Sequence, residues 1–558
     1  MKLLNVEQIK EIDRVSIEEL GIPGATLMSN AAEHLAKIAM KHIPHDGHVA
    51  IFCGTGNNGG DGIGAAAYLL EKGISIRTFL IGDMDKLTPD SKVMKKRLDS
   101  LKGYVEPYSP SADLVDYVSE CSVVIDAIFG VGLNADLRGD ALSAVSVINS
   151  SRAFVIAADI PTGVHADTGT ILGDAVKADI TVTFSFAKPG HFVEPGGVYC
   201  GELIVCDIGI PQQLLDKTVS HTYAAMPDDI VLPRRKLNTH KGDYGRALIV
   251  SGSVGYTGAP ALAARATTKT GAGLVSVGVP KSIYDILAVK LDEEMPFPLT
   301  DDKNGQLIAN AAGEIVRRVK KSDVCLIGPG LGMSDGISEL VQSILPLSDV
   351  PIVLDADGLN AIADNIDILH QAICPLILTP HLGEFDRLCV DMLKEKELEV
   401  EKEVQAEVQS MLNDTGSHGE STNSNITSSN AQNTTDAPIK KPPFDRLRTA
   451  CDFASKYGCI LVLKGHRTII ALPNGMAYIN TTGGPAMAKG GSGDVLAGMI
   501  AALIAQHLPV VHAVTVAVYI HGLAGDMCAE QFGEYSVTAS DIINMIPQAM
   551  KLIVYGIE

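Results

Sequence analysis

GGPAMAKGGSGDVLAGMIAALIAQH, residues 483–507, joins a glycine-rich loop to a long apolar helix. Glycines let the backbone turn sharply and let a bulky anion approach the main chain. The unpaired N–H groups at a helix start attract negative charge, yet Asp494 also stands at this helix start. A carboxylate there suits a hydroxyl that is deprotonated while a phosphoryl group is transferred to it. The alternative is a structural turn in which Asp494 only caps the helix.

The composition indicates a compact α/β protein of several domains. The chain has 558 residues, which corresponds to two to four domains, and 46% of them are hydrophobic. The 54 glycines are typical of α/β domains with many tight strand–helix turns. A formal net charge of −21 argues against a general nucleic-acid or anionic-membrane binder. Phosphate ligands must therefore be held by local loops.

Cysteine usage and hydropathy favour a soluble cytoplasmic protein with no membrane partner. The ten cysteines include no CxxC pair, which indicates reduced thiols and no zinc site. The N-terminus has no signal-peptide pattern. The most apolar stretch, 495–520, is interrupted by Gln506, His507, Pro509 and His512, which favours two buried helices over a membrane span.

The first half of the chain predicts a doubly wound, Rossmann-like parallel sheet. Two amphipathic helices, at 5–20 and 25–42, precede the strand HVAIFC at 48–53, the glycine-rich turn GTGNNGGDG at 54–62 and a helix from about 61 to 72. Strand, glycine-rich turn and helix form the phosphate-binding start of such a sheet. Further buried strands are predicted at 75–82, 122–130, 154–164, 180–186 and 202–209.

Polar side chains gather at the predicted strand ends. Asn57, Asn58 and Asp61 lie in the glycine-rich turn, and Asp126 and Asp159 end buried strands. Ligands of open parallel sheets bind outside the carboxyl ends of the strands, so these groups predict a site. A glycine turn alone would be weak evidence, and a strand-end acid can simply cap the next helix. Two amides with an acid, however, suit a cation or a sugar hydroxyl.

Three motifs of this half, in order, resemble the NAD(P)H-hydrate epimerase domain: GTGNNGGDG, DAIFGVGLNAD (126–136) and DIPTGVHADTG (159–169). The resemblance covers about 1–222 and implies epimerisation of the hydrated nicotinamide ring of NADH or NADPH (NADHX and NADPHX). One departure is LMSNAA at 27–32, where the family usually has an acid after LM and a final glycine.

The resemblance also implies roles for single residues. Asp159 would be the proton-handling carboxylate, and a potassium ion would be held by Asn58, Asp126 and Thr162, whose oxygens suit a hard cation. The residues that would bind the hydrate are Asn57, Asn58, Gly59, Gly60, Asp61, Gly130, Val131, Gly132, Leu133, Asn134, Ala135, Asp136 and Asp159.

The second half, placed at 223–558, predicts another α/β domain. A strand, a glycine loop, a helix and a strand are expected within 238–280, and two apolar helices at about 510–530 and 539–550 close the chain. Buried strands that open into polar or glycine-rich turns are expected in VCLIGPGLG (324–332), VPIVLDADGLN (350–360), PLILTPHLGEF (375–385) and ILVLKGHRTII (460–470).

The motifs KGDYG, GPGLG, DADGLN, TPHLGEF, LKG with a following Thr, and AKGGSGD resemble ADP- or ATP-dependent NAD(P)H-hydrate dehydratase, a ribokinase-like family. The fused arrangement resembles that of ADP users, so ADP is the expected phosphoryl donor and ATP stays open. Magnesium is expected to spread the charge of the transferring phosphoryl group. A homo-oligomer is the expected assembly. The partners would be small molecules, the hydrates and the nucleotide, and not nucleic acid.

By the same resemblance, the hydrate would meet Ala259, Gly330 and His381, and Asp494 would activate its hydroxyl. The main-chain N–H of Gly493 would approach the nucleotide phosphate. The residues that would contact the nucleotide are Lys464, Gly465, His466, Arg467 and Thr468. Structural alternatives stay open: a tight turn at Gly330, a helix cap at His381 and a solvated strand-end lysine at Lys464.

An insertion at about 391–445 fits no element of the family. It runs from a charged, helix-like stretch into a Ser/Thr/Asn-rich stretch, a composition typical of disorder. Two other functions remain possible on sequence alone. One is a ribokinase-like kinase of a vitamin precursor, which would release a phosphorylated product. The other is a first half that only binds ligand or acts as a scaffold.

Overall fold

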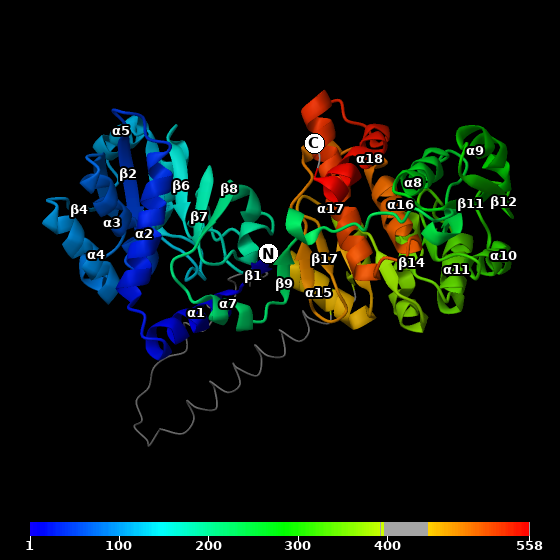
Figure 1. Ribbon diagram of the computed structural model, residues 1–558, viewed down its shortest axis with the longest axis horizontal. Coiled ribbons are helices and arrows are strands. Elements are labelled where there is room, and N and C mark those ends of the chain that lie inside the picture. Colours follow the sequence, from blue (N-terminus) through cyan, green and yellow to red (C-terminus); the bar gives the residue numbers. More distant parts are fainter. Residues whose placement is uncertain (391, 395–444, 557–558) are drawn as a thin grey trace, which may run out of the picture.

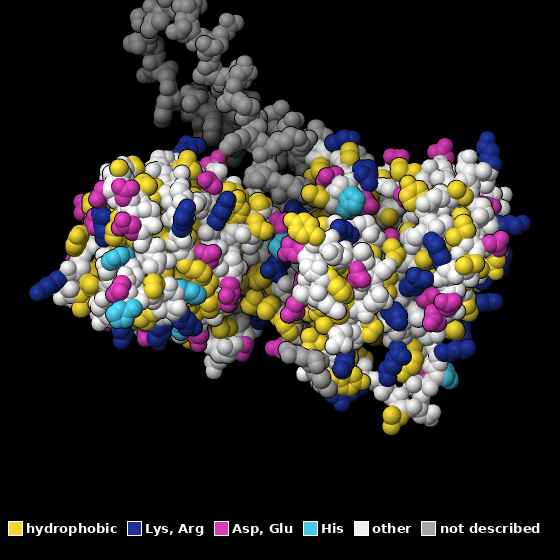
Figure 2. Space-filling view, turned by 90° about the horizontal axis from the view of Figure 1, so that it is seen from above, with side chains coloured by type: hydrophobic (Ala, Val, Ile, Leu, Met, Phe, Trp, Pro, Cys, Tyr) yellow, Lys and Arg dark blue, Asp and Glu magenta, His cyan; other side chains and the backbone are white. Residues whose placement is uncertain are grey.

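The computed structural model describes residues 1–390, 392–394 and 445–556, so all but a few residues of the predicted insertion lie outside the described part of the chain. The two halves form two lobes that meet at a narrow junction (Figures 1 and 2). Basic and acidic side chains are mixed over the face that Figure 2 shows. The predicted α/β class with parallel sheets is confirmed.

The first lobe is built on a seven-stranded sheet in which every pair is parallel. Four of its strands are buried along nearly their whole length, as expected of strands that are covered on both faces. In spatial order the strands are β4 (Val105–Pro107), β3 (Ser75–Leu80), β2 (His48–Cys53), β5 (Val123–Ala127), β6 (Phe154–Ala158), β7 (Ile180–Phe184) and β8 (Glu202–Cys206). The six predicted strands are present, and β4 is an additional short edge strand.

Helices cover both faces of this sheet, which makes it doubly wound. One face packs against α2 (Gly24–Met40), α3 (Asn57–Glu71) and α4 (Pro89–Ser100). The other packs against α5 (Ala112–Glu120) and α6 (Gly139–Ser150). The short N-terminal helix α1 (Val6–Arg14) lies over the carboxyl ends of the strands, beside the first cavity described below.

Helix α3 begins four residues earlier than predicted, at Asn57, so the predicted glycine-rich turn is mostly helical. The reason is packing. A Cβ atom on Gly59 would lie 1.8 Å from the carbonyl oxygen of Gly54, and one on Gly62 would lie 2.6 Å from Cβ of Ala127. These glycines let the helix press directly onto the strand ends, which outweighs their low helix propensity.

The second lobe is built on an eleven-stranded sheet. Seven neighbouring strands are parallel, in the order β12 (Met295–Leu299), β11 (Leu274–Pro280), β10 (Arg246–Val250), β13 (Val324–Ile327), β14 (Ile352–Leu354), β15 (Leu376–Leu378) and β16 (Ile460–Leu463). The order continues with β17 (Ile469–Ala471), β18 (Ala477–Ile479), β9 (Thr222–Ala224) and β1 (Lys2–Leu3). The stretch 460–470 is therefore a hairpin, since β16 and β17 are antiparallel.

Two apolar layers cover this second sheet. One contains α8 (Gly258–Lys269), α9 (Tyr284–Lys290), α16 (Ser492–Ala505), α17 (Val510–Phe532) and α18 (Ala539–Tyr555). The other contains α10 (Ala312–Val319), α11 (Asp335–Ile344), α12 (Asp357–Asn360), α13 (Leu382–Leu388) and α15 (Arg446–Tyr457). Within the described residues, α17 is the one helix long and apolar enough to cross a membrane, and 67% of its apolar window is buried in the fold. The prediction of two buried helices over 495–520 is confirmed.

The junction joins the two lobes through backbone pairing and apolar contact. β1, at the N-terminus, pairs with β9 of the second sheet, so the predicted polar connection near residue 222 contains a strand (Figure 1). The N–H of Leu4 donates to the carbonyl of Ala187 at 3.0 Å. Ala187, Phe192 and Val193 of the first half belong to an apolar core cluster of the second half.

Candidate active sites

A cavity of about 590 Å³ opens at the carboxyl ends of β2, β5 and β6. Asp159, directly after β6, lines the cavity. Its backbone has a positive φ of 67°. Such a backbone is unfavourable for a non-glycine residue and is often found at functional sites. The Asp159 carboxylate accepts a hydrogen bond from the Lys188 ammonium and another from the N–H of Val131 at 3.3 Å. Lys188 is buried, with an exposed fraction of 2%, and Asp159 is largely covered, with an exposed fraction of 13%.

Lys188 is held in place by further hydrogen bonds. Its Nζ also donates to Oγ1 of Thr183 at 2.6 Å. Nδ1 of His191 accepts from the Lys188 N–H at 3.1 Å, so Nε2 carries the proton and donates to the Asp159 carbonyl at 2.9 Å. Burial, together with the nearby Lys188 charge, lowers the pKa of His191 to about 3. His191 is therefore neutral and acts as a fixed hydrogen-bonding group.

Three carboxyl groups in this cavity differ in their proton affinity. Burial by itself would raise the pKa of Asp159, but the Lys188 charge and hydrogen bond outweigh it, and the pKa lies below its usual value. Burial, and then repulsion from Asp159, raises the pKa of Asp13 to about 6. The same two causes hold the pKa of Asp61 well above its ordinary range. Environments that push carboxyl pKa values apart are the usual basis of acid and base roles.

Of the residues predicted to hold potassium, Asn58 lines this cavity, and Asp126 and Thr162 are buried at the ends of the neighbouring strands. Asp126 is fully buried and accepts hydrogen bonds from Oγ1 of Thr162 at 2.7 Å and from its N–H at 2.8 Å. Both amide atoms of Asn58 are buried and find no hydrogen-bond partner within the described residues. Buried polar atoms without partners are costly, so Asn58 fits an oxygen-liganded ion. In residues 1–390, 392–394 and 445–556 no group of three or more His, Cys, Asp or Glu side chains is arranged to hold a metal.

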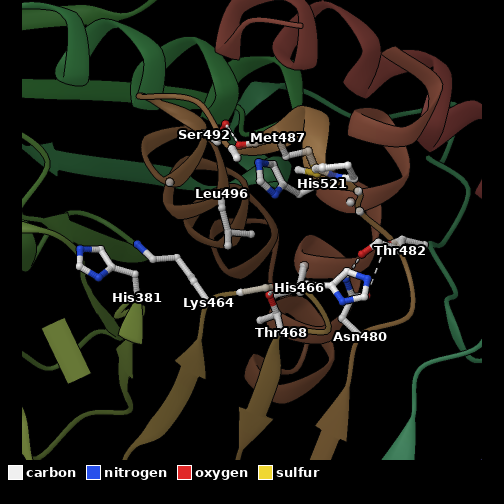
Figure 3. A pocket seen from close by; sticks show the side chains of 18 of the residues that line it. His381, Lys464, His466, Thr468, Asn480, Thr482, Met487, Ser492, Leu496 and His521 are labelled. Carbon is white, nitrogen blue, oxygen red and sulfur yellow. Dashed lines mark hydrogen bonds between the residues drawn. The ribbon is translucent and has the colours of Figure 1, made fainter. Parts of the chain in front are cut away.

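A second cavity, of about 780 Å³, lies at the N-terminus of α16 (Figure 3). Gly491, with φ of 93°, turns the chain into the helix, and Gly493 and Asp494 follow in its first turn. Lys464, from the end of β16, donates to Oδ1 of Asp355 at 2.8 Å. A Cβ atom on Gly493 would lie 3.2 Å from Nζ of Lys464. An ammonium group and the N-terminus of a helix thus converge here, an arrangement that suits a phosphate.

Asp494 titrates near neutral pH in this setting. Burial and repulsion from Asp355 raise its pKa to about 7, although the Lys464 charge partly opposes the rise. A general base works best with a pKa near the operating pH. Asp494 can therefore accept a proton from a hydroxyl bound in the cavity.

The turn between β16 and β17, residues Lys464–Thr468, forms one wall of this cavity. Oγ1 of Thr468 donates to the carbonyl of Gly465 at 3.0 Å and closes the turn. Arg467 has a positive φ of 58° and donates to the carbonyl of Thr481. His466 projects toward Asn480 and Thr482, on the side of the cavity away from His381 (Figure 3).

Comparison with known proteins matches each half to a family. Residues 24–190 match the model of the YjeF-related protein N-terminus, and residues 247–420 and 435–548 match that of NAD(P)H-hydrate dehydratase. The bifunctional NAD(P)H-hydrate repair enzyme Nnr of Thermofilum pendens is 36% identical over 553 residues, covering 99% of this chain and 96% of that protein. The chain belongs to the bifunctional NAD(P)H-hydrate repair enzyme family.

Other similar proteins cover the whole chain or its second half. The repair enzyme Nnr of Moorella thermoacetica is 36% identical over 565 residues, covering 99% of this chain and 97% of that protein. The ADP/ATP-dependent NAD(P)H-hydrate dehydratase of Bacillus subtilis, crystallised with ATP and Mg²⁺, is 25% identical with a TM-score of 0.43. It covers 59% of this chain and 98% of that chain.

In this member of the repair enzyme family, most of the residues predicted to bind the hydrate in the first half line the first cavity. These are Asn57, Asn58, Asp61, Gly130, Val131, Gly132, Leu133 and Asp159. The predicted Gly59 and Gly60 are instead buried within α3. Asn134 and Ala135 are exposed on the loop that follows Leu133, and Asp136 is half-buried there.

The second cavity also gathers most of its predicted residues. His381, Lys464, Gly465, His466, Thr468, Gly493 and Asp494 line it. His381 is also the N-cap of α13 and accepts from the Glu384 N–H at 3.2 Å, so the helix-cap alternative describes it too. Ala259 and Gly330 face each other, since a Cβ atom on Gly330 would lie 3.1 Å from that of Ala259. This pair is not among the residues that line the cavity.

Several side chains in the two cavities were missed by the sequence motifs. Asp13 and Lys188 enter the first cavity from α1 and from the segment after β7. Asp355, Glu194 and His521 enter the second. Nε2 of His521 is buried without a hydrogen-bond partner among the described residues. Asp355 lies at a strand end in the motif DADGLN, and its position could have predicted it. The other four residues lie outside every motif.

Proposed function

We propose that this enzyme repairs hydrated NADH and NADPH in two steps. The first half interconverts the R and S forms of the hydrate. The second half removes water from the S form with ADP, or alternatively ATP, as phosphoryl donor. The observation that carries the proposal is the meeting of Lys464, Gly493 and Asp494 in one cavity of a chain that also has a separate acid-lined cavity. The relatives from Thermofilum pendens and Moorella thermoacetica, named as bifunctional NAD(P)H-hydrate repair enzymes, support the same reaction.

In the second cavity, Asp494 takes the proton of the ring hydroxyl as that oxygen attacks the terminal phosphorus of the nucleotide. The bond from phosphorus to the bridging oxygen breaks, and the nucleotide leaves with one phosphate fewer. Lys464 and the N–H groups at the start of α16 offset the negative charge of the transferring group. Phosphate is a better leaving group than hydroxide. The ring nitrogen lone pair expels it, and loss of a proton from the adjacent carbon restores the dihydronicotinamide.

In the first cavity, epimerisation needs one group that accepts a proton and one that donates it. The carbon that bears the hydroxyl inverts when water leaves from one face and another water adds from the other. Asp159, kept ionised by Lys188, suits the acceptor role. Asp61, whose pKa burial raises, suits the donor role.

Two ions complete the proposal. Asn58, Asp126 and Thr162 would hold potassium, a role supported by the unpaired amide oxygen of Asn58 and by the side-chain oxygen that each of the three residues offers. Bound there, potassium would supply positive charge beneath the hydrate. Magnesium would accompany the nucleotide phosphates in the second cavity. A cytoplasmic location and a homo-oligomeric assembly also remain proposals; all ten cysteines being free thiols supports the first.

Product analysis tests the proposal. The full chain is incubated with separated R and S hydrates, magnesium, potassium and either ADP or ATP, and the products are separated by chromatography. The expected products are the reduced dinucleotide, inorganic phosphate and a nucleotide shortened by one phosphate. A stable phosphorylated small molecule would instead identify a kinase of the ribokinase-like type. A lack of R-to-S conversion would make the first half a binding module.

A further inference from the structure

Two residues of the first half, Glu194 and Val198, line the cavity of the second half, and Glu194 is the charged one. Glu194 follows Phe192 and Val193, which are buried in an apolar core cluster of the second half with exposed fractions of 6% and 2%. This apolar anchor fixes the backbone on which Glu194 stands. The carboxylate therefore reaches across the junction from a firmly packed segment.

Glu194 contacts the predicted nucleotide turn directly. Nδ1 of His466 and Oε1 of Glu194 are 2.6 Å apart, and Nη1 of Arg446 donates to Oε2 at 3.4 Å. His466 is the central residue of the turn Lys464–Thr468. Arg446, at the start of α15, also presses on the turn, because a Cβ atom on Gly465 would lie 2.8 Å from its Nη2.

The turn meets carboxylates from both halves, since the Arg467 charge interacts with Asp526 of the second half and with Glu194 of the first. The Arg467 guanidinium lies 6.0 Å from the ring of Phe192, and Arg446 has an exposed fraction of 13%. Glu194 supplies the carboxylate that pairs with Arg446 and His466. Charge-assisted hydrogen bonds of this kind fix geometry as well as adding energy.

We propose that Glu194 is a positioning residue of the nucleotide site, so that the first half sets the nucleotide affinity of the second. This inference rests on the proposed nucleotide role of the Lys464–Thr468 turn. Glu194 holds His466 and, through Arg446, the turn in the conformation that meets the nucleotide. A carboxylate at this end of the cavity also repels phosphate, which favours the nucleoside end here and the phosphates beside Lys464 and Gly493.

Binding and kinetics of full-length variants test the proposal. ADP with magnesium is titrated calorimetrically into the wild-type chain, Glu194→Ala and Glu194→Gln, and KM and kcat are measured for dehydration of the S hydrate. Loss of one partly exposed charge-assisted contact weakens ADP binding roughly five- to ten-fold. The KM for ADP rises by the same factor, and kcat stays within about two-fold because Asp494 is untouched. Glu194→Gln keeps the shape of the side chain, so any loss of ADP affinity in this variant is due to the loss of the negative charge.

A matched control and a double variant separate positioning from general damage. Glu106 pairs with Arg77 at 2.8 Å inside the first half and has an exposed fraction of 24%, close to the 28% of Glu194. Glu106→Gln leaves ADP binding unchanged. Adding Glu194→Ala to His466→Ala weakens binding by a smaller factor than Glu194→Ala weakens the wild type, because the two residues share one of the contacts that Glu194 makes.

The overturning results are distinct. Unchanged ADP affinity in both Glu194 variants would overturn the inference alone. A Glu194 variant that loses epimerisation and ADP binding together and has a lowered thermal midpoint would also overturn it. Lys188 lies on the same segment, so such a result would mean that the substitution disturbs the junction and both sites. An absence of binding of both ADP and ATP by the wild-type chain would overturn the proposed function, and this inference with it.

Discussion

Replacing Lys188 with methionine tests the chemistry assigned to the first cavity. The substitution keeps the length and apolar stem of the side chain but removes the charge that faces Asp159. Asp159 has an exposed fraction of only 13%, so water compensates poorly for the lost ammonium group. Removing one partner of a buried ion pair costs about 3–5 kcal/mol.

The size of the effect follows from the burial of Asp159. Without Lys188, nothing offsets the cost of burying this carboxylate, and the pKa of Asp159 rises above its ordinary value. The lower end of the range for a broken ion pair, about 3 kcal/mol, is then lost from the free energy of unfolding at neutral pH. For a half of this size the thermal midpoint falls by roughly 6–12 °C. Epimerisation slows roughly 10²-fold, because a misplaced catalytic group costs about that much.

The pH dependence distinguishes this cause from simple loss of packing. In the wild type the folded pKa of Asp159 is lowered, so its contribution is present above its ordinary pKa and is lost only as the pH falls below that value. In the variant the folded pKa is raised. The free energy of unfolding lost by the variant is then largest at neutral pH. The loss shrinks as the pH falls toward about 4, where the buried carboxyl is protonated without penalty.

Circular dichroism melts of the full chain at several pH values measure the deficit, since the protein has no Trp for fluorescence. Lys177→Met, at an exposed lysine of the same half, is the matched control and leaves the midpoint unchanged. Two results would refute the reasoning: a thermal midpoint of Lys188→Met that equals the wild-type value at neutral pH, or a difference in midpoint that stays constant from pH 7 to 4.

Further predictions concern the second cavity, the cation residues and the insertion. Asp494→Asn slows dehydration roughly 10²–10⁴-fold, as for loss of a general base, and leaves epimerisation intact; rates followed by chromatography check both, and near-normal dehydration would contradict the assignment. Dehydration measured as kcat/KM falls as the pH drops through about 7, where Asp494 gains a proton. In Asp355→Asn, kcat/KM falls at a lower pH than in the wild type, because Asp355 raises the pKa of Asp494. An unchanged pH profile would argue against an interaction between the two carboxyl groups. Asn58→Ala abolishes repair of the R form alone and its stimulation by potassium; unchanged R-form repair would exclude the cation role. Deleting about 412–440 leaves both activities intact, and a collapse of dehydration would show that the insertion takes part in catalysis.

The strands that carry the two sites could be predicted because they are buried on both faces. β2 begins and ends at the predicted residues, His48 and Cys53, since a parallel strand covered by helices is a continuous apolar run. β1 and β9 could not be predicted. They contain two and three residues, and their pairing joins positions more than 200 residues apart, which depends on how the lobes dock.

Glycine-rich loops led to Asn58 and Asp494, a strand-end acid to Asp159, and the family resemblance to Lys464. The loops could not distinguish glycines that face a ligand from glycines that face a helix. Gly59 belongs to the second kind, as the 1.8 Å approach of its Cβ position to Gly54 demonstrates.

Residues that reach a cavity from outside the motifs were beyond sequence reasoning. Lys188 and Glu194 lie six positions apart on one segment, yet each enters a different cavity. Which of them faces which ligand depends on the path of that segment across the junction, and no local pattern encodes it.

Recovery of the dihydronicotinamide absorbance band from pure R hydrate tests the central claim most directly. The mixture contains the full chain, magnesium, potassium and ADP, with a parallel series in ATP. The account predicts complete recovery from the R hydrate by the wild type. It also predicts that Asp159→Asn fails with R while still restoring S, and that Asp494→Asn fails with both. Recovery from S but not from R by the wild type would contradict the claim that one chain carries both activities.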